Sequence, residues 1–519
     1  MKSTTETRAI TLLEASSAVS AASVQSHVAH SFYVPAGVSR LQLSFSYEPE
    51  WLEDRAKGLE MAQAAVSFYQ GEEHTEEVAL SLLPLRNLAT LSLADPNGFR
   101  GACHRGGPQQ LTISEAFASP GLLKGELPAG MWTLTVSMHA IVTDELAYRV
   151  AVTAHGESVQ RRDGYVWRNK PLERPFPVYP RTAADLRQNS RERTWMACEL
   201  HAHTLHSDGR QTLLEMAQHA KELNLACVAV TDHNTTSPLQ EKEAVERETG
   251  IRILNGLEWT TFFGHMLTLG YRTAEYTDWR AAGPEDIHAG IQEVHRLGAL
   301  AGIAHPFRIG NPVCTGCYWE FAIEDIAEFD YIEVWNSVFP SGKRSNQQAF
   351  QLWTELLNQG YLIPAVSGRD WHGNEESNPL IAVTHVHVPA GTEDFREDLL
   401  QAIREGRMTV SLGPVLDLLM HTASHTHTIG DCVNNPDGHA LFEIQMTMPE
   451  HLHAAIALDS LQIQLVSNLG TLVAGERGSA SLHVVHATDS LAWVRAELYG
   501  TVDGLHVLAA FTNPIYLVQ

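Results

Sequence analysis

The sequence predicts an α/β protein in which a TIM-like barrel lies between two β-sandwich-like domains. Three changes of pattern along the 519 residues support this fold class. Apolar and polar residues alternate with period two over roughly 28–154, strands alternate with helices from Trp195 onwards, and a strand pattern returns after Arg407. Because one ordinary core does not grow to this size, several domains are expected.

These changes divide the chain into four parts. We expect an N-terminal β-sandwich-like domain over 1–160, a linker over 161–195, a barrel over 196–412 and a C-terminal β-rich domain over 413–519. The linker segment is rich in Arg, Asn and Pro, which breaks any periodic pattern and is typical of an extended surface connection.

The N-terminal part carries strand patterns without helical spacing between them. Leu41, Leu43 and Phe45 alternate with polar residues, and the segments 132–138 and 146–152 repeat that rhythm. Turn residues such as those of 95–98 separate the runs, which favours a sandwich over βαβ units. No catalytic constellation is evident there, so a packing or substrate-shaping role is predicted.

The barrel is predicted from alternating strands and helices. Thr212 and Glu215 form a capping box before a helical pattern, and Gly298 is a typical C-cap glycine. The expected strands are 226–230, 251–259, 264–271 as a return strand, 300–305, 331–336 and 362–370, with helices at 238–248, around 287–297 and at 346–358. Such alternation implies a parallel sheet and a distorted or incomplete TIM-type barrel. The C-terminal part returns to strand alternation, as at Leu461, Ile463 and Leu465.

A first group of candidate metal ligands follows the first two barrel strands. Residues two apart share one face of a strand, so His201 and His203 can hold one ion together. Asp208 lies in a Ser-Asp-Gly turn from which its carboxylate can bend back, and His233 follows the apolar run 225–230.

Five further candidates follow the later strands. They are Glu258, His265, His305, Asp370 and His372. Barrel enzymes keep their chemistry at the carboxyl ends of the strands, so all nine side chains are expected on one rim. Oxygen and imidazole ligands without thiolates suit Zn²⁺, Mn²⁺ or Fe²⁺, and Glu258 could bridge two ions.

Composition limits the partners. The net charge of -25 argues against nucleic acid or an anionic membrane surface, so a small-molecule substrate is expected. The 27 histidines fit a metal-binding chain. Six scattered cysteines predict reduced thiols, and the lone Cys314-x-x-Cys317 is a weak signal for a metal or redox pair. With neither a signal-peptide pattern nor a membrane-spanning run, a cytoplasmic location is predicted. The oligomeric state stays open, with a homo-oligomer among the possibilities.

The ordered motifs resemble those of the polymerase and histidinol phosphatase (PHP) family of the amidohydrolase superfamily. The similar segments are His201-x-His203 with Asp208, 231–233, 256–258, 304–306 and 367–372, and the resemblance covers about Cys198 to Pro414. A looser resemblance, in 258–265, 87–98 and 511–516, links the chain to the branch that contains carbaryl hydrolases.

The resemblance implies a distorted (βα)₇ barrel with up to three divalent ions. One ion would take His201, His203, Glu258 and Asp370, a second Glu258, His265 and His305, and a third Asp208, His233 and His372. Arg369 and Trp371 depart from the family pattern and could reshape the substrate pocket.

Metal chemistry then predicts the mechanism. A water shared between two divalent cations loses a proton near neutral pH and becomes the nucleophile, with Glu258 as the bridging ligand. Asp370 or Asp232 could move the proton, and for Asp232 a role in orienting a ligand histidine is an equal alternative. Arg308 or Arg369 could stabilise the developing negative charge, and Asn336 and Trp371 are candidates for lining the substrate pocket.

Three functions compete. Hydrolysis of a small ester, carbamate or amide by the multinuclear centre is favoured, and hydrolysis of a phosphomonoester or phosphodiester with the same ions is the alternative. A non-catalytic metal-binding module paired with carbohydrate-binding sandwiches is the third. It would be indicated by missing ligands, whereas every ligand position is filled here.

Overall fold

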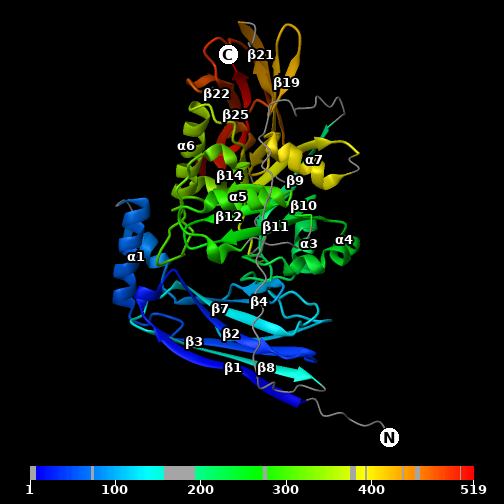
Figure 1. The fold of residues 1–519 in the computed structure, drawn as a ribbon. Helices are drawn as coiled ribbons and strands as arrows, with labels where there is room; N and C mark the ends of the chain where they lie inside the picture. The colour runs from blue at the N-terminus through cyan, green and yellow to red at the C-terminus, as the bar shows by residue number, and fades with distance from the viewer. Residues whose placement is uncertain are drawn as a thin grey trace.

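A computed structural model describes residues 8–71, 75–156, 193–272, 278–373, 381–391, 394–434, 438–449, 456–502 and 504–518. Figure 1 shows the N-terminal strands in blue and cyan at one end, the central strands and helices mainly in green, and the C-terminal strands in orange and red at the other end. The predicted linker lies outside the described residues except for 193–195, which begin strand β9.

The N-terminal region contains two four-stranded antiparallel sheets. One has the order β1 (Arg8–Val19), β8 (Leu146–Gly156), β3 (Arg40–Glu48) and β6 (Gln109–Ser114). The other has the order β2 (Ser26–Val34), β7 (Gly130–Ala140), β4 (Leu88–Asp95) and β5 (Gly98–Cys103). Leu41 and Leu43 of the first sheet share one buried core with Leu134 and Val136 of the second. The sheets therefore pack face to face, as the alternation predicted.

Two helices that the sequence reading missed follow the third strand. Helices α1 (Arg55–Gln70) and α2 (Thr75–Ser81) lie at the edge of the N-terminal region (Figure 1). Asp54 caps α1 by accepting hydrogen bonds from the backbone N–H groups of Ala56 and Lys57. The alanine-rich segment 62–65 favours a helix over a strand, a local preference that the flanking strand patterns obscured.

Seven neighbouring strands form the central region. They are β9 (Arg193–Ala202), β10 (Cys227–Val230), β11 (Arg252–Thr260), β12 (His265–Leu269), β13 (Leu300–Ile303), β14 (Tyr331–Asn336) and β15 (Ala365–Gly368). Helices α3 (Leu213–Glu222), α4 (Lys242–Thr249), α5 (Ile287–Arg296) and α6 (Arg344–Asn358) follow β9, β10, β12 and β14. The predicted capping box of Thr212 and Glu215 at the start of α3 is confirmed.

The central sheet is parallel except at one strand. Strand β12 runs antiparallel to both β11 and β13, as expected for the predicted return strand. With four α-helices for seven strands, this part of the chain is richer in sheet than a regular TIM barrel.

A closed TIM barrel is not shown. Between the last and first of these strands, the described backbone forms one isolated parallel bridge, from Ala202 to Trp371. The His203 N–H donates to the Trp371 carbonyl at 2.8 Å, and the Trp371 N–H donates to the His201 carbonyl at 3.0 Å. Instead of closing, the sheet continues from β9 into β16 (Val383–Pro389) and then β17 (Met408–Ser411).

The C-terminal strands extend that same sheet. Strand β17 pairs with β26 (Leu505–Thr512), and β25 (Trp493–Val502), β22 (Gln462–Ser467) and β23 (Gly470–Ala474) follow in order. A second sheet has the order β19 (Thr426–Thr428), β18 (Val415–His421), β21 (His439–Thr447) and β24 (Ser481–Ala487), while β20 (Cys432–Asn434) pairs with β27 (Ile515–Val518). Leu416 and Leu418 share a buried core with Ile463 and Leu465, so the two sheets form a second sandwich-like layer pair.

Helix α7 (Phe395–Arg404) joins β16 to β17. Among the helices in the described ranges, none combines the length and apolar composition needed to cross a bilayer.

His387 on β16 makes stability sensitive to pH. Burial, followed by the nearby Arg193 and Arg407, lowers the pKa of His387 from about 6.5 to about 4. Between these values the unfolded chain binds the proton more tightly, so this histidine destabilises the fold progressively as pH falls through that window. Because the ring is half-buried, we expect a loss of about 1–2 kcal/mol between pH 7.5 and 4.5.

Urea unfolding midpoints at the two pH values measure this loss. His387→Gln should lose less stability on acidification than the unsubstituted chain, whereas His439→Gln, at an exposed position, should not change the difference. Equal acid losses in the unsubstituted chain and both variants would show that His387 does not contribute.

Candidate metal centre

The structure brings all nine predicted ligands to one edge of the central sheet. The parallel strands β9, β10, β11, β13 and β15 end there, and β12 begins there because it runs in the opposite direction. The nine residues are therefore delivered by six strand ends: His201, His203, Asp208, His233, Glu258, His265, His305, Asp370 and His372. Most of these residues are buried, with Asp208, Asp370 and His372 partly exposed.

The first ligand group combines His201, His203, Glu258 and Asp370, whose ligand atoms lie within 4.8 Å of one another. His203 Nε2 lies 3.0 Å from Asp370 Oδ1 and 3.4 Å from Glu258 Oε2. His201 Nε2 lies 3.4 Å from the same Glu258 oxygen. The group is the one that the family resemblance implied.

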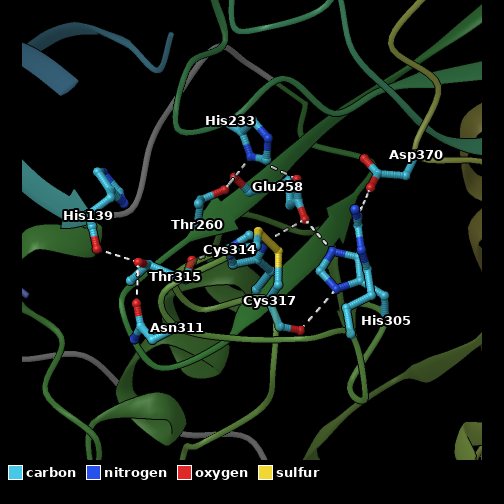
Figure 2. The surroundings of a disulfide bond; sticks show 12 residues. His139, His233, Glu258, Thr260, His305, Asn311, Cys314, Thr315, Cys317 and Asp370 are labelled. Carbon is cyan, nitrogen blue, oxygen red and sulfur yellow. Dashed lines mark hydrogen bonds and ion pairs between the residues drawn. A yellow bond between two sulfur atoms is a disulfide. The ribbon is translucent and has the colours of Figure 1, made fainter. Parts of the chain in front are cut away.

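The second group surrounds Glu258. His265 Nδ1 and His305 Nε2 lie 2.9 and 3.0 Å from Glu258 Oε1, while His233 Nδ1 lies 2.8 Å from Glu258 Oε2. Figure 2 shows His233 and His305 on opposite sides of this carboxylate. The carboxylate thus contacts both predicted partners and, in addition, His233.

The third group contains Asp208, His233 and His372, and the structure adds His203 to it. His372 Nε2 lies 3.1 Å from Asp208 Oδ1, and His233 Nε2 lies 3.5 Å from that oxygen. His372 Nδ1 donates to the Asp370 carbonyl at 2.7 Å, which leaves its other nitrogen facing Asp208.

The donor set fits divalent cations. Four buried ligand atoms of the first and third groups make no hydrogen bond: His201 Nε2, His203 Nε2, Asp208 Oδ1 and Glu258 Oε2. Buried polar atoms without such bonds are costly, and metal ions held by these two groups would satisfy them. His305 and Asp370 also have positive φ angles, 26° and 55°, a strained backbone conformation that is concentrated at functional sites.

Electrostatics supports the same conclusion. Burial alone would lower the pKa of His372, but Asp370 and Asp208 raise it to about 10. Burial alone would raise the pKa of Glu258, but His233, His201 and His265 hold it well below its usual range. The carboxylates thus create a strongly cation-attracting site.

Outer partners orient the ligand rings. Glu333 accepts a hydrogen bond from His201 Nδ1 at 2.9 Å and another from the His305 backbone N–H, also at 2.9 Å. A carboxylate behind a ligand histidine fixes its tautomer and leaves the other ring nitrogen for the metal. The sequence reading overlooked Glu333, although an acidic residue inside the apolar strand β14 is an unusual signal.

Two backbone carbonyls of the 314–317 loop hold further ligands. His265 Nε2 donates to the Thr315 carbonyl and His305 Nδ1 to the Cys317 carbonyl, both at 3.3 Å. The remaining ring nitrogens of these histidines face Glu258.

Cys314 and Cys317 form a disulfide beside the ligands (Figure 2). The prediction that the cysteines are reduced is therefore wrong for this pair. The turn brings the two Cα atoms to 5.4 Å, a separation that a disulfide can span. The other four cysteines are free, as predicted.

Asp232 lies behind the ligands. It accepts hydrogen bonds from the backbone and hydroxyl groups of Thr204 and Ser207 at 2.6–2.9 Å. The Ser207 hydroxyl also lies 3.5 Å from His203 Nδ1. This arrangement favours the orienting role for Asp232 over proton transfer.

A cavity of about 960 Å³ lies beside the candidate ligands. All four predicted substrate residues line it, together with Asp370 and His372: Arg308, Asn336, Arg369 and Trp371. Arg308 forms an ion pair with Asp370. Asn336 also donates to Glu333 at 3.2 Å.

Trp371 combines pocket lining with a packing role. It is only 3% exposed, and the Arg369 guanidinium lies 4.4 Å from its ring centroid. Arg369 and Trp371, the two residues that depart from the family pattern, therefore stack on each other at the cavity.

Residues 199–300 match the PHP domain. Within the predicted barrel, this segment therefore resembles that domain. The family resemblance is thereby confirmed for that segment, which is shorter than the predicted span of 198–414.

Two curated relatives share part of the chain. Over 117 residues it is 36% identical to 3',5'-nucleoside bisphosphate phosphatase of Chromobacterium violaceum, covering 21% of this chain and 40% of that protein. Over 179 residues it is 26% identical to an uncharacterized protein of Methanocaldococcus jannaschii, covering 32% of this chain and 98% of that protein. The similarity thus spans less than half the length of the phosphatase.

Solved structures are similar at low identity. One is a two-domain protein from Bacteroides vulgatus that contains a predicted PHP-like metal-dependent phosphoesterase, with 13% identity, a TM-score of 0.35, and coverage of 63% of this chain and 100% of that chain. Another is an amidohydrolase from Chromobacterium violaceum with bound sulfate and no metal, with 20% identity, a TM-score of 0.27, and coverage of 41% and 96%.

Proposed function

We propose that this chain is a metal-dependent phosphoesterase acting on a small anionic phosphate ester. The sequence alone favours hydrolysis of an ester, carbamate or amide over hydrolysis of a phosphoester, and the proposal reverses this preference. The observation that carries it is the charge of the 960 Å³ cavity beside the ligands. Four cationic side chains line it, Arg308, Lys343, Arg344 and Arg369, against one carboxylate, Asp370, among its described lining residues.

This local charge is opposite to that of the whole chain, whose net charge is -25. An uncharged ester or carbamate is not attracted by such a concentration of cations before it reacts, whereas a phosphate ester is attracted and oriented by it. The phosphatase name of the Chromobacterium violaceum relative supports the same substrate class.

Different residues would hold the metal ions, stabilise charge at the reacting group and bind the rest of the substrate. Bound divalent ions, Zn²⁺, Mn²⁺ or Fe²⁺ at two or three positions, would supply an acidified water and neutralise phosphoryl charge. Arg308 lines both the large cavity and the smaller one that contains the ligands, so its guanidinium is placed to stabilise negative charge on the reacting phosphoryl group. Three further cationic side chains line the large cavity but not the smaller one, and they would bind the rest of an anionic substrate: Arg369, Lys343 and Arg344.

Ester or carbamate hydrolysis is the second candidate, supported by the looser resemblance to carbaryl hydrolases. Two of the segments that carry this resemblance have packing roles here. The Asn87 side chain accepts from the Val142 N–H at 2.7 Å, and the Asn513 side chain accepts from the Ala365 N–H at 2.7 Å. Asn87 and Asn513 in these segments therefore have structural roles. The resemblance there does not indicate the substrate class, which we infer from the cavity instead.

A substrate panel tests the proposal. We expect kcat/KM for p-nitrophenyl phosphate or a nucleoside 3',5'-bisphosphate to exceed that for p-nitrophenyl acetate or an aryl carbamate by about 100-fold or more. Raising the salt concentration from about 50 to 500 mM should increase KM for the phosphate esters, because the cations attract them through screened charge, and leave KM for the neutral ester unchanged. Preferential cleavage of the ester or carbamate would instead support the second candidate.

A further inference from the structure

The N-terminal β-domain is fastened to the PHP domain beside the ligands. The Gly121 N–H donates to Ser237 Oγ at 3.1 Å, and Thr235 Oγ1 donates to the Gly121 carbonyl at 2.9 Å. Arg105 donates to the Leu205 carbonyl at 3.1 Å. Both loops 204–208 and 231–237, which carry ligands Asp208 and His233, are thus held by the N-terminal domain.

Gly121 allows this close approach. Its φ of +95° favours glycine, and a Cβ there would lie 2.5 Å from the Ala102 carbonyl oxygen and 3.2 Å from the His206 carbonyl oxygen. The turn at Gly121 therefore packs closely between the end of β5 and the 204–208 loop.

His104 directly follows β5 and enters this contact. Its ring centroid lies 4.5 Å from that of the ligand His233 and 4.7 Å from that of His139 on β7. The His104 side chain is only 8% exposed, and its Nδ1 is buried without a hydrogen bond. A ring nitrogen left in this state costs free energy unless a ligand satisfies it.

His104 lines the same cavity as the metal ligands. This cavity of about 280 Å³ is lined on one side by Asp208, His233, Glu258, His265, His305, Asp370 and His372. Arg86, Leu88, His104, His139 and Ala140 of the N-terminal domain line the other side. His139 is already held, because its Nε2 bonds Thr90 at 2.9 Å and its carbonyl accepts from Thr315 (Figure 2), whereas His104 is not.

We propose that His104 is a substrate-contacting residue, supplied by the N-terminal β-domain to the hydrolytic centre of the PHP domain. A ring nitrogen of His104 would hydrogen-bond an oxygen of the substrate held at the ligands. The N-terminal domain is then one wall of the active site. The inference rests on the proposed hydrolytic function, but it does not depend on the substrate being a phosphate ester.

Two substitutions separate substrate contact from packing. His104→Phe keeps an aromatic ring against His233 and His139 but removes both nitrogens, and His104→Asn keeps a polar group near the Nδ1 position. We expect His104→Phe to lower kcat/KM by about tenfold or more and to weaken the binding of inorganic phosphate, measured by calorimetry, by about fivefold or more. His104→Asn should restore part of both losses.

Metal content, measured by elemental analysis, should be unchanged in both variants. His155→Phe, on β8 in the other sheet of the same domain, is the matched control and should behave like the unsubstituted chain. A fully active His104→Phe would show that the ring only packs, and a loss of bound metal would show that His104 acts on the ions; either result overturns the proposal.

The outcome is separable from that of the phosphoesterase proposal. The variants are assayed on whichever substrate class the unsubstituted chain hydrolyses, with acetate replacing phosphate as the binding probe if that class is carboxylic esters. Should His104→Phe fold poorly, as judged by its thermal unfolding midpoint, the contrast between His104→Asn and the unsubstituted chain still decides the matter.

Discussion

Glu258→Gln is expected to lower kcat/KM by about 10³-fold or more. Glu258 is fully buried, and its two oxygens lie 2.8–3.0 Å from His233, His265 and His305. Glutamine keeps the shape of the side chain, but it removes the negative charge that would bridge two cations and places an NH₂ donor against imidazoles. The effect should therefore fall on metal content and turnover together.

Steady-state kinetics and elemental analysis on the purified variant measure this effect. Glu328→Gln is the matched control, because Glu328 also pairs with a histidine, His288, at 2.9 Å, but away from the centre. The control should keep its activity and its metal. A Glu258→Gln protein that folds and turns over substrate at an unchanged rate would contradict the metal-dependent mechanism.

Removing the metal should abolish activity and lower the thermal unfolding midpoint by several degrees. Three carboxylates, Asp208, Glu258 and Asp370, gather with six imidazoles in a largely buried site, so an ion that binds only the folded chain stabilises it. At a free ion concentration about 1,000 times the dissociation constant, binding of one ion raises the free energy of unfolding by about 4 kcal/mol. Dialysis against a chelator, followed by calorimetric unfolding and an activity assay, measures both losses.

Restoring Zn²⁺, Mn²⁺ or Fe²⁺ one at a time should recover both properties for the ion that the site prefers, and titration would count the ions bound. Asp208→Asn provides the internal comparison, because losing one carboxylate of the third group should reduce the stabilisation by added metal. A chelated chain with unchanged activity and an unchanged unfolding midpoint would rule out this site as a metal centre.

The positions of the candidate ligands could be predicted from the sequence because each lies at or close to one end of a short strand. His201 and His203 have the same-face spacing of a strand, and Asp370 and His372 repeat that spacing near the last strand of the series. Strand ends of a mainly parallel sheet meet at one edge whatever the intervening loops contain. Local pattern and sheet geometry were therefore sufficient to bring these groups together.

The sequence did not indicate how the sheet would end. The alternation of strands and helices predicted a distorted or incomplete TIM-type barrel without indicating where it would open. A single bridge at Ala202 and Trp371 joins the first and last barrel strands, and the sheet passes into β16, β17 and the C-terminal strands. Pairing between distant strands depends on which edges are left open, and this carries no periodic signal along the chain.

By itself, the sequence determined the order and spacing of the nine candidate ligands and the strands that present them, since these depend on short segments. Only the tertiary structure decided which side chains surround them. Glu333, the carbonyls of Thr315 and Cys317, and His104 come from separate strands and loops, and their roles arise from contacts over long chain separations. Such contacts depend on how distant strands, loops and domains pack together, and no local pattern of residues encodes that packing.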